Sequence, residues 1–420
     1  DDSKAIHDIA LNIRDKYVDY INSLNNLFVK NNLIYNNEIS IFYFSDLFNK
    51  RTEIFTTYIS LCHVIYLKEY LFNNPVIKSI QTVECPSSFN IALASILDDR
   101  IKFRTLKEER EIPSLLKSYA RHFKYFIVSI IKLVLIKSLY SRPLKIHSKS
   151  LFLTRYPLHF DMNYREEKYG DLIKKNDSYL ISILTDGMHQ NIGLRDIIIH
   201  AKDLSNRNNF ILLESYLKII DLLLGLINSI ILENRSKNLY NNNYYFEGIN
   251  IKKFILKEIQ YSFKRIPRLF CYRSAIRKAF LNIRPNKFIF YLHEYSYGKY
   301  FNYVVAKYFP NIERIGFQHG PASRRKLLYY LGKDIVSNSP DKWLHSTPIP
   351  DKVISEDKLS KFIYEESGYN NVEIMKKVYR LNYIKLISRL GVQKDIILLV
   401  PGLHDGVLLI RKLFNHITVN

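Results

Sequence analysis

The chain has little cysteine and no spacing that would hold a metal. Its 420 residues include three cysteines, Cys62, Cys85 and Cys271, which lie far apart in the sequence. An odd, scattered set of thiols provides neither a disulfide framework nor a Cys-x-x-Cys pair, so we expect a reducing, cytoplasmic compartment. Asp186-x-x-His189 invites a metal interpretation, but no third ligand at helical spacing accompanies it, so we expect no metal site.

Long apolar runs without charge are also scarce. The run from Phe123 to Tyr140 contains Lys124, Lys132 and Lys137, and three charges in a stretch of about 18 residues make a poor membrane span. Lysines beside apolar residues fit two alternatives. One is an interfacial helix on anionic lipid, which would be peripheral on the inner face of the cell membrane. The other is a core helix whose lysines reach solvent.

A second apolar run, Leu212 to Leu232, has polar residues at helical spacing. Glu214, Lys218, Asp221 and Asn228 predict a polar stripe on one face, so we expect a soluble amphipathic helix.

No secretory signal is visible at the start of the sequence. The chain opens with Asp1-Asp2-Ser3, continues into a polar amphipathic helix and lacks an initiator methionine. We expect a trimmed start or a fragment.

Negative charge is in short supply. Lysine and arginine number 62 against 40 acidic residues, a net charge of +22, which favours polyanionic partners such as an anionic membrane surface or phosphorylated donors. Asn, Ile, Lys and Tyr are abundant throughout, as an AT-rich coding sequence would produce, and this accounts for part of the charge. The basic residues form no single tract and carry no recognition motif, so we expect no specific nucleic-acid binding.

Composition and pattern predict a globular α/β protein. Hydrophobic residues make up 47% and charged residues 24%, and the length allows two domains. Neither a Walker loop nor a GxGxxG motif is present. Runs of strand length alternate with helical segments, which predicts a parallel sheet. The expected strands in the first half are Ile39 to Phe44, Val76 to Val83, Ile101 to Arg104, Ser150 to Thr154, Tyr179 to Leu184 and Phe210 to Leu213.

Three of these strands end in polar residues. Arg155 and His159 follow the first, Asp186 and His189 the second, and Glu214 the third. Polar groups at the carboxyl ends of parallel strands line substrate crevices, so we expect Arg155, Asp186 and His189 to bind substrate.

A later unit of strand, loop, helix, strand and loop adds a candidate catalytic pair. The apolar run Lys287 to Leu292 precedes Glu294, and Arg314 to Phe317 precedes His319. Both loops fall at the same sheet edge, where a carboxylate and an imidazole can share acid and base chemistry. The alternative is that each residue is a satisfied polar group at the end of an element.

The residues around His319 suggest how this site would be shaped. Gln318 offers a donor and an acceptor, and Gly320 lets backbone approach a ligand. Arg324 and Arg325 can neutralise the phosphates or carboxylate of an activated donor.

The run YLHEYSYGKYFNYVVAKYFPNIERIGFQHG resembles the end of the N-terminal domain of GT-B glycosyltransferases that build bacterial surface polysaccharides. In that family a strand ending in Glu, a helix and a strand ending in Gln-His-Gly occur in this order, and the resemblance extends to about Arg380. It implies a Rossmann-like parallel sheet with helical insertions, and transfer of a sugar from a nucleotide-sugar donor, as co-substrate and without a cofactor, to a surface polysaccharide or lipid-linked glycan acceptor.

The same resemblance sets the expected domains and alternatives. Residues 1–390 would form the acceptor-side domain, and residues 391–420, with an apolar strand at Asp395 to Val400, would begin a donor-side domain that is largely missing. A polypeptide without that domain would be inactive alone. The alternatives are a polyol-phosphate transferase that uses a CDP-alcohol, and a non-catalytic basic scaffold at the membrane surface.

Overall fold

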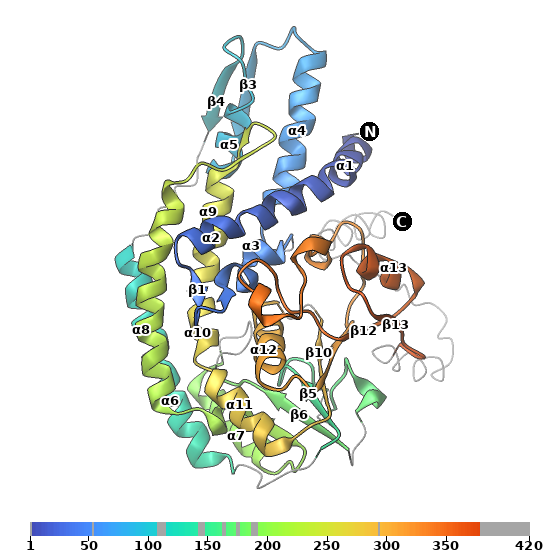
Figure 1. The fold of residues 1–420 in the computed structure, drawn as a ribbon. Coiled ribbons are helices and arrows are strands. Elements are labelled where there is room, and N and C mark those ends of the chain that lie inside the picture. Colours follow the sequence, from blue (N-terminus) through green and yellow to red (C-terminus); the bar gives the residue numbers. More distant parts are fainter. Residues whose placement is uncertain are drawn as a thin grey trace, which may run out of the picture. The chain divides into compact units, whose positions relative to one another are not determined.

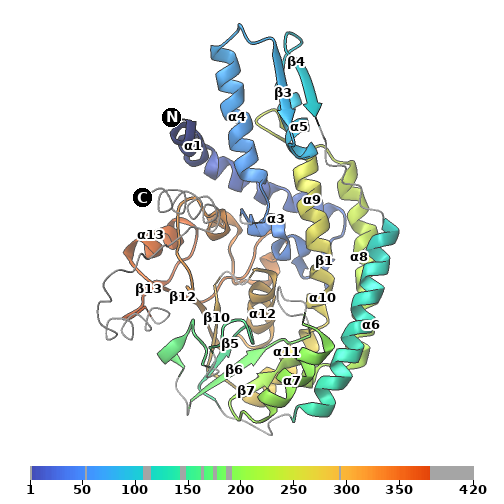
Figure 2. The same ribbon diagram turned by 180° about the vertical axis from the view of Figure 1, so that it is seen from behind.

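The computed structural model describes residues 2–52, 54–106, 115–141, 148–161, 165–173, 177–185, 192–292 and 295–378. Within them the fold is α/β, built on a seven-stranded parallel sheet of order β13-β12-β11-β10-β5-β6-β7 (Figures 1 and 2). The strands are β5 (Ser150–Leu153), β6 (Ser178–Ser182), β7 (Phe210–Leu212), β10 (Lys287–Tyr291), β11 (Glu313–Phe317), β12 (Lys352–Ser355) and β13 (Val372–Ile374).

The order of the strands reverses at one place in this sheet. Successive strands β5, β6 and β7 extend to one side, whereas β10 to β13 extend to the other, so β5 and β10 are neighbours. Numbered along the chain, the order is 3-2-1-4-5-6-7, which is that of a doubly wound sheet with one added strand. Ligands of such sheets bind at the carboxyl edge beside the reversal, here between β5 and β10.

Apolar residues on both faces of the central strands explain why the sheet is buried on both sides. In β10, Phe288 and Phe290 join one hydrophobic core, whereas Ile289 and Tyr291 join a second core. Strands buried on both faces read as continuous apolar runs, as this one does. The first core includes residues of α11 (Arg273–Ile283) and α12 (Tyr295–Tyr308), and the second includes residues of α7 (Leu194–Ser205).

The remaining helices build the first core outward from the sheet (Figure 1). They are α1 (Asp2–Ser23), α2 (Asn25–Lys30), α3 (Asp46–Asn49), α4 (Thr57–Asn73), α5 (Ser87–Ala94), α6 (Leu115–Leu139), α8 (Ile219–Ser236), α9 (Lys252–Phe263), α10 (Ile266–Phe270) and α13 (Lys358–Glu366). Three two-stranded sheets accompany them, formed by β1 (Ile34–Tyr35) with β2 (Ile39–Ser40), β3 (Ser79–Val83) with β4 (Lys102–Leu106), and β8 (Tyr245–Phe246) with β9 (Ile249–Asn250).

Two predictions for the N-terminal strands need correction. The expected strand at residues 39–44 is only the two-residue β2, followed by a 3₁₀ turn at Ile41–Phe44 whose side chains are all buried. The Ser40 hydroxyl accepts a hydrogen bond from Phe42 N, which favours a turn over an extended chain. The strands expected at residues 76–83 and 101–104 form as β3 and β4, but they pair with each other outside the central sheet.

The polar stripe expected on residues 212–232 meets solvent only in part, since Lys218 and Asn228 are exposed. Glu214 belongs to a 3₁₀ turn that precedes α8, and Asp221 is half-buried. The exposed side of α8 consists mostly of isoleucine and leucine.

Among the described residues, no helix is both long enough and apolar enough to cross a membrane. Contacts divide the chain into a unit of residues 1–379 and a unit of residues 380–420. The second unit lies outside the described residues, so the expected boundary at residue 391 and the strand at residues 395–400 stay predictions.

Candidate functional site at the carboxyl edge of the sheet

The loop after β5 turns back beneath the edge of the sheet. Its start is held by Thr154 N, which donates to Ile181 O at 2.9 Å, so the loop leaves β5 alongside β6. Further on, Glu167 N donates to His159 O at 2.8 Å, and a bridge joins Phe160 to Glu166. The loop therefore doubles back and brings His159 and Glu166 to the end of β10.

Glu166 lies at the centre of a buried polar group. Its carboxylate accepts a short hydrogen bond from the Tyr291 hydroxyl at the end of β10, and another from Tyr169 N. Tyr169 stacks on Tyr291 with ring centroids 4.5 Å apart, and its hydroxyl donates to Leu153 O at 2.8 Å. These contacts join the ends of β5 and β10, the two strands that flank the reversal of strand order.

Two histidines approach the same tyrosine. The ring centroid of Tyr291 lies 4.9 Å from that of His159 and 4.7 Å from that of His319. The two imidazole centroids are 6.3 Å apart. His159 is buried, whereas His319, which follows β11, is half-buried. His319 is therefore the better placed of the two to meet a ligand at the edge.

Burial and charge set the protonation of this group. Burial raises the pKa of Glu166 from 4.5 to about 7, although hydrogen bonds to its carboxylate oppose the shift. Burial, with the nearby charges of Arg155, His319 and Lys168, lowers the pKa of His159 to about 2, so this imidazole stays neutral. Burial, and to a smaller extent the negative charge of Glu166, raises the pKa of Tyr291 well above its usual range. The site thus combines a neutral imidazole, a carboxyl that titrates near neutrality and cations at its border.

Gln318 holds two loops of the sheet edge together. Its amide nitrogen donates to Gly320 O at 2.8 Å and to Ser360 Oγ at 3.1 Å, and its amide oxygen accepts from Glu356 N at 2.8 Å. Because the protein itself engages both ends of this amide, we assign Gln318 to positioning the His319 loop against the loop after β12. Direct contact of Gln318 with substrate, which the sequence suggested, stays a prediction.

The other expected binding residues lie beside open space. A methyl group added at Gly320 would have no heavy atom within 4 Å apart from its chain neighbours, which agrees with room for a ligand. Arg324 and Arg325 are both exposed, and the Arg324 guanidinium lies 5.4 Å from the centroid of the Phe362 ring. Arg155 is half-buried, and its charge acts on His159.

Three of the expected site residues, Asp186, His189 and Glu294, lie outside the described residues, so their roles stay predictions. Glu214, which also follows a predicted strand, is fully buried. It accepts hydrogen bonds from Leu184 N, Thr185 N and the Thr185 hydroxyl, so it ties the end of β7 to the loop after β6.

Sequence reasoning did not single out Glu166, Tyr169 or Tyr291. His159 was expected at a strand end, but nothing in the sequence connected it with a glutamate in the same loop. The one signal was the cluster of charges from Arg165 to Lys168 in the segment between two expected strands. Two adjacent glutamates in that cluster cannot be told apart without the fold.

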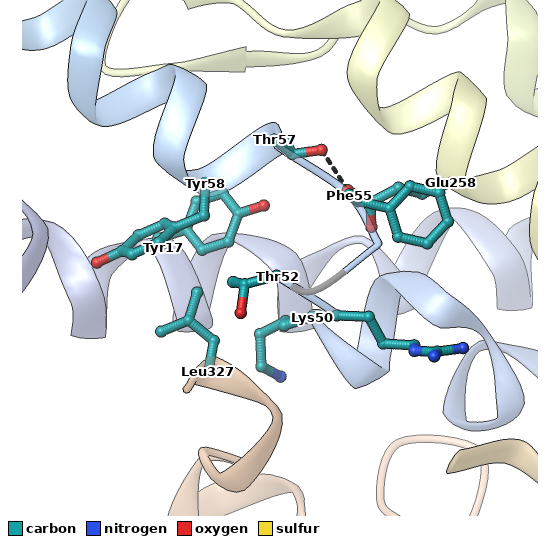
Figure 3. Close-up of a pocket in the computed structure, with 9 residues that line it drawn as sticks. Tyr17, Lys50, Thr52, Phe55, Thr57, Tyr58, Glu258 and Leu327 are labelled. Atoms are coloured by element: carbon teal, nitrogen blue, oxygen red, sulfur yellow. Dashed lines mark hydrogen bonds between the residues drawn. The ribbon is translucent and has the colours of Figure 1, made fainter. Parts of the chain in front are cut away.

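A second group of buried charges lies where α3, α4 and α9 meet, and the small size of the cavity beside it argues against a ligand site. Figure 3 shows Lys50, Glu258 and Thr57 around a cavity of about 10 Å³, which is about the room of one water molecule. Glu258 accepts a hydrogen bond from Thr57. Burial lowers the pKa of Lys50 to about 7 and raises that of Glu258 to about 8. We therefore treat this group as structural.

Comparison with known proteins adds no relative to this picture. No family model, no curated protein and no solved structure matches the chain.

Proposed function

We propose that this protein is a glycosyltransferase of the GT-B type, which moves a sugar from a nucleotide-activated donor to a surface polysaccharide or lipid-linked glycan. The observation that carries the proposal is the position of the histidine and glutamate group, beside the reversal of strand order between β5 and β10. Crevices at this place in doubly wound sheets bind ligands. The resemblance of the Gln318-His319-Gly320 segment to the family supplies the reaction.

In this reaction His319 and Glu294 act as the catalytic pair. One of them takes the proton from the acceptor hydroxyl as its oxygen attacks the anomeric carbon of the sugar. The new glycosidic C–O bond forms while the bond from that carbon to the donor phosphate breaks, and the nucleotide leaves with the electron pair. An imidazole at a half-buried position suits this role because its ordinary pKa lies near neutrality.

Cations at the border of the site stabilise the departing phosphate. Arg155 and Lys168 lie close enough to His159 for their charges to lower its pKa, and Arg324 and Arg325 are exposed after the His319 loop. Guanidinium groups bind phosphate oxygens in pairs, which fixes the leaving group as well as neutralising it.

Glu166, Tyr291 and His159 are positioning residues in this proposal. Tyr291 contacts both imidazole rings, and Glu166 fixes the Tyr291 hydroxyl. A neutral His159 adds no further charge beside His319. The His319 imidazole thus packs against a buried tyrosine that is held in place by a hydrogen bond to Glu166.

Chemical modification tests whether His319 faces a donor. Diethylpyrocarbonate acylates accessible imidazoles, and mass spectrometry follows each site. The full-length protein, which includes the expected donor-side domain, is treated with and without UDP-, GDP- and CMP-sugars and CDP-glycerol. We expect one of the nucleotide sugars to slow the modification of His319 by about fivefold or more and to leave His345, an exposed histidine outside this group, unchanged.

Each result of this experiment decides between the candidates. Protection by CDP-glycerol alone would favour the polyol-phosphate transferase. Protection by none of the compounds at saturating concentrations would overturn both enzyme proposals and favour the non-catalytic scaffold. Equal protection of His319 and His345 would mean that the compounds act on the reagent and not at this site.

A further inference from the structure

Helices α6 and α8 form an antiparallel pair that is joined by two contacts between polar side chains. The Tyr119 hydroxyl donates to Asn234 Oδ1, and His122 Nε2 lies 3.3 Å from Glu233 Oε2. Both members of the His122–Glu233 pair are buried, although the two helices lie side by side at the margin of the fold in Figures 1 and 2. Helices on the surface of soluble proteins normally place charged side chains toward water, so the burial of His122 and Glu233 is unusual.

Small residues allow the close approach of α8 to its neighbours. A methyl group at Gly225 would lie 2.0 Å from Cys271 Sγ and 2.9 Å from Phe126, and Ser229, one turn on, is buried. The Ser229 hydroxyl donates to Gly225 O at 2.8 Å. Small residues four apart on the buried side are typical of helices whose outer surface meets an apolar medium.

The outward side of the pair is apolar. Ten large apolar residues of α6 and α8 are between 41% and 56% exposed. They are Phe123, Ile127, Ile131 and Val134 of α6, and Ile219, Ile220, Leu223, Leu224, Ile227 and Ile231 of α8. We call this set the α6–α8 face. The antiparallel register places Ile127 level with Ile227, and Phe123 level with Ile231. Contiguous apolar faces of this size on soluble proteins mark interaction surfaces.

The exposed charges beside the α6–α8 face have one sign, whereas Asp221 of α8 is half-buried and accepts a hydrogen bond from Lys218 N. Helix α6 carries five cations, Lys117, Arg121, Lys124, Lys132 and Lys137, and no acidic residue. Among those residues of α6 and α8 whose side chains the structure describes, the exposed charged ones are all lysines, and the exposed Lys218 precedes α8.

We propose that the α6–α8 face docks on the surface of an anionic lipid bilayer, with its isoleucine and leucine side chains among the acyl chains and its lysines at the lipid phosphates. This arrangement is that of an interfacial amphipathic helix pair, which lies in the membrane surface. The proposal does not rest on the transferase reaction, since it uses no residue of the sheet edge.

Charge favours a bilayer over a second copy of the chain as the occupant. Two copies joined through the same face would bring together two borders whose exposed charged residues are all lysines. Anionic lipids supply the missing negative charge and the apolar medium at once.

Vesicle co-sedimentation of the full chain tests the proposal. We expect binding to vesicles of phosphatidylcholine with phosphatidylglycerol, weaker binding to phosphatidylcholine alone, and loss of binding as salt rises. Ile127→Gln with Ile227→Gln should lower the partition coefficient by about tenfold or more, because two half-exposed side chains together contribute about as much as one fully buried one. The control, Leu281→Gln with Leu359→Gln, changes two residues that are each 59% exposed elsewhere and should bind as the wild type does.

A second pair of variants separates local charge from net charge. Lys117→Gln with Lys124→Gln should lower binding to anionic vesicles on the order of tenfold, whereas Lys342→Gln with Lys358→Gln, the same loss of charge at exposed lysines elsewhere, should have little effect.

Three outcomes would overturn the proposal. They are no binding to anionic vesicles at low salt, equal effects of the test and control variants, and a dimer in light scattering that is lost in the Ile127→Gln/Ile227→Gln variant. The last result would assign the face to a second copy of the chain.

Discussion

Replacing Glu166 with glutamine tests the electrostatics of the sheet edge with little change of shape. The amide matches the protonated carboxyl, since its oxygen can accept from Tyr169 N while its nitrogen donates to the Tyr291 oxygen. The variant therefore keeps the packing and removes the titration.

The size of the effect follows from the shifted pKa. Burial raises the pKa of Glu166 from 4.5 to about 7, so the folded state binds more protons than the unfolded state between these values. The contribution of the protonated Glu166 carboxyl to the free energy of unfolding is therefore fully present below pH 4.5 and is lost as pH rises to about 7. At about 1.4 kcal/mol per pKa unit, the loss amounts to about 3 kcal/mol. Because glutamine does not titrate, Glu166→Gln should become more stable than the wild type by up to that amount.

Urea unfolding from about pH 5 to about pH 8 measures this difference. The gap in unfolding free energy between Glu166→Gln and the wild type should widen as pH rises toward 7 and then stay constant. Glu167→Gln is the matched control, because the neighbouring carboxylate is exposed, and it should follow the wild type within about 0.5 kcal/mol. Parallel curves for Glu166→Gln and the wild type would refute the assignment of a neutral, buried carboxyl.

Two further variants test packing and buried charge away from this edge. Gly225→Ala places a methyl group 2.0 Å from Cys271 Sγ and 2.9 Å from Phe126, so calorimetry should show a loss of about 1–3 kcal/mol; an unchanged melting temperature would mean that the helices move apart at no cost. Lys50→Met removes a buried amine whose pKa is lowered to about 7 and which donates to Phe48 O, so above pH 7 the unfolding free energy of the wild type should rise relative to that of the variant by about 1.4 kcal/mol per pH unit. Equal slopes for the two proteins in urea unfolding would contradict a neutral Lys50.

The central sheet could be predicted because local pattern and tertiary burial agree there. Runs such as Lys287 to Leu292 are apolar throughout, and both faces of β10 are covered in the structure. Residues 39–44 show the limit of the same reasoning. That run is equally apolar and aromatic, but all of its 3₁₀ residues are buried by neighbouring helices, so burial alone does not distinguish a strand from a compact turn.

Half of the candidate site was accessible to sequence reasoning. His319 and Arg155 follow strands directly, so alternation placed them at the sheet edge. Glu166 contacts Tyr291 only because the loop after β5 doubles back, and that path depends on backbone hydrogen bonds such as Glu167 N to His159 O. A loop that folds back in this way produces no periodic pattern of residues, so the sequence gives no sign of it.

The outward face of α8 was predicted only in part, for a different reason. Periodicity shows that polar and apolar residues occupy different sides of a helix, but it does not say which side meets water. The predicted polar stripe was assigned to solvent, and Lys218 and Asn228 are indeed exposed. Glu214 is buried, however, and most of the outward side consists of apolar residues such as Ile227.

The most direct test of the proposed reaction compares two histidine variants of the full-length protein, because a polypeptide without the donor-side domain is expected to be inactive. Nucleotide release from the donor that protects His319 is measured for His319→Ala and for His345→Ala, which removes an exposed imidazole. Loss of a general acid or base lowers kcat/KM by about 10²–10⁴-fold, so we expect His319→Ala to fall by about 100-fold or more and His345→Ala to stay within about twofold of the wild type. Equal rates for His319→Ala and the wild type would contradict the assignment of this sheet edge as the catalytic site.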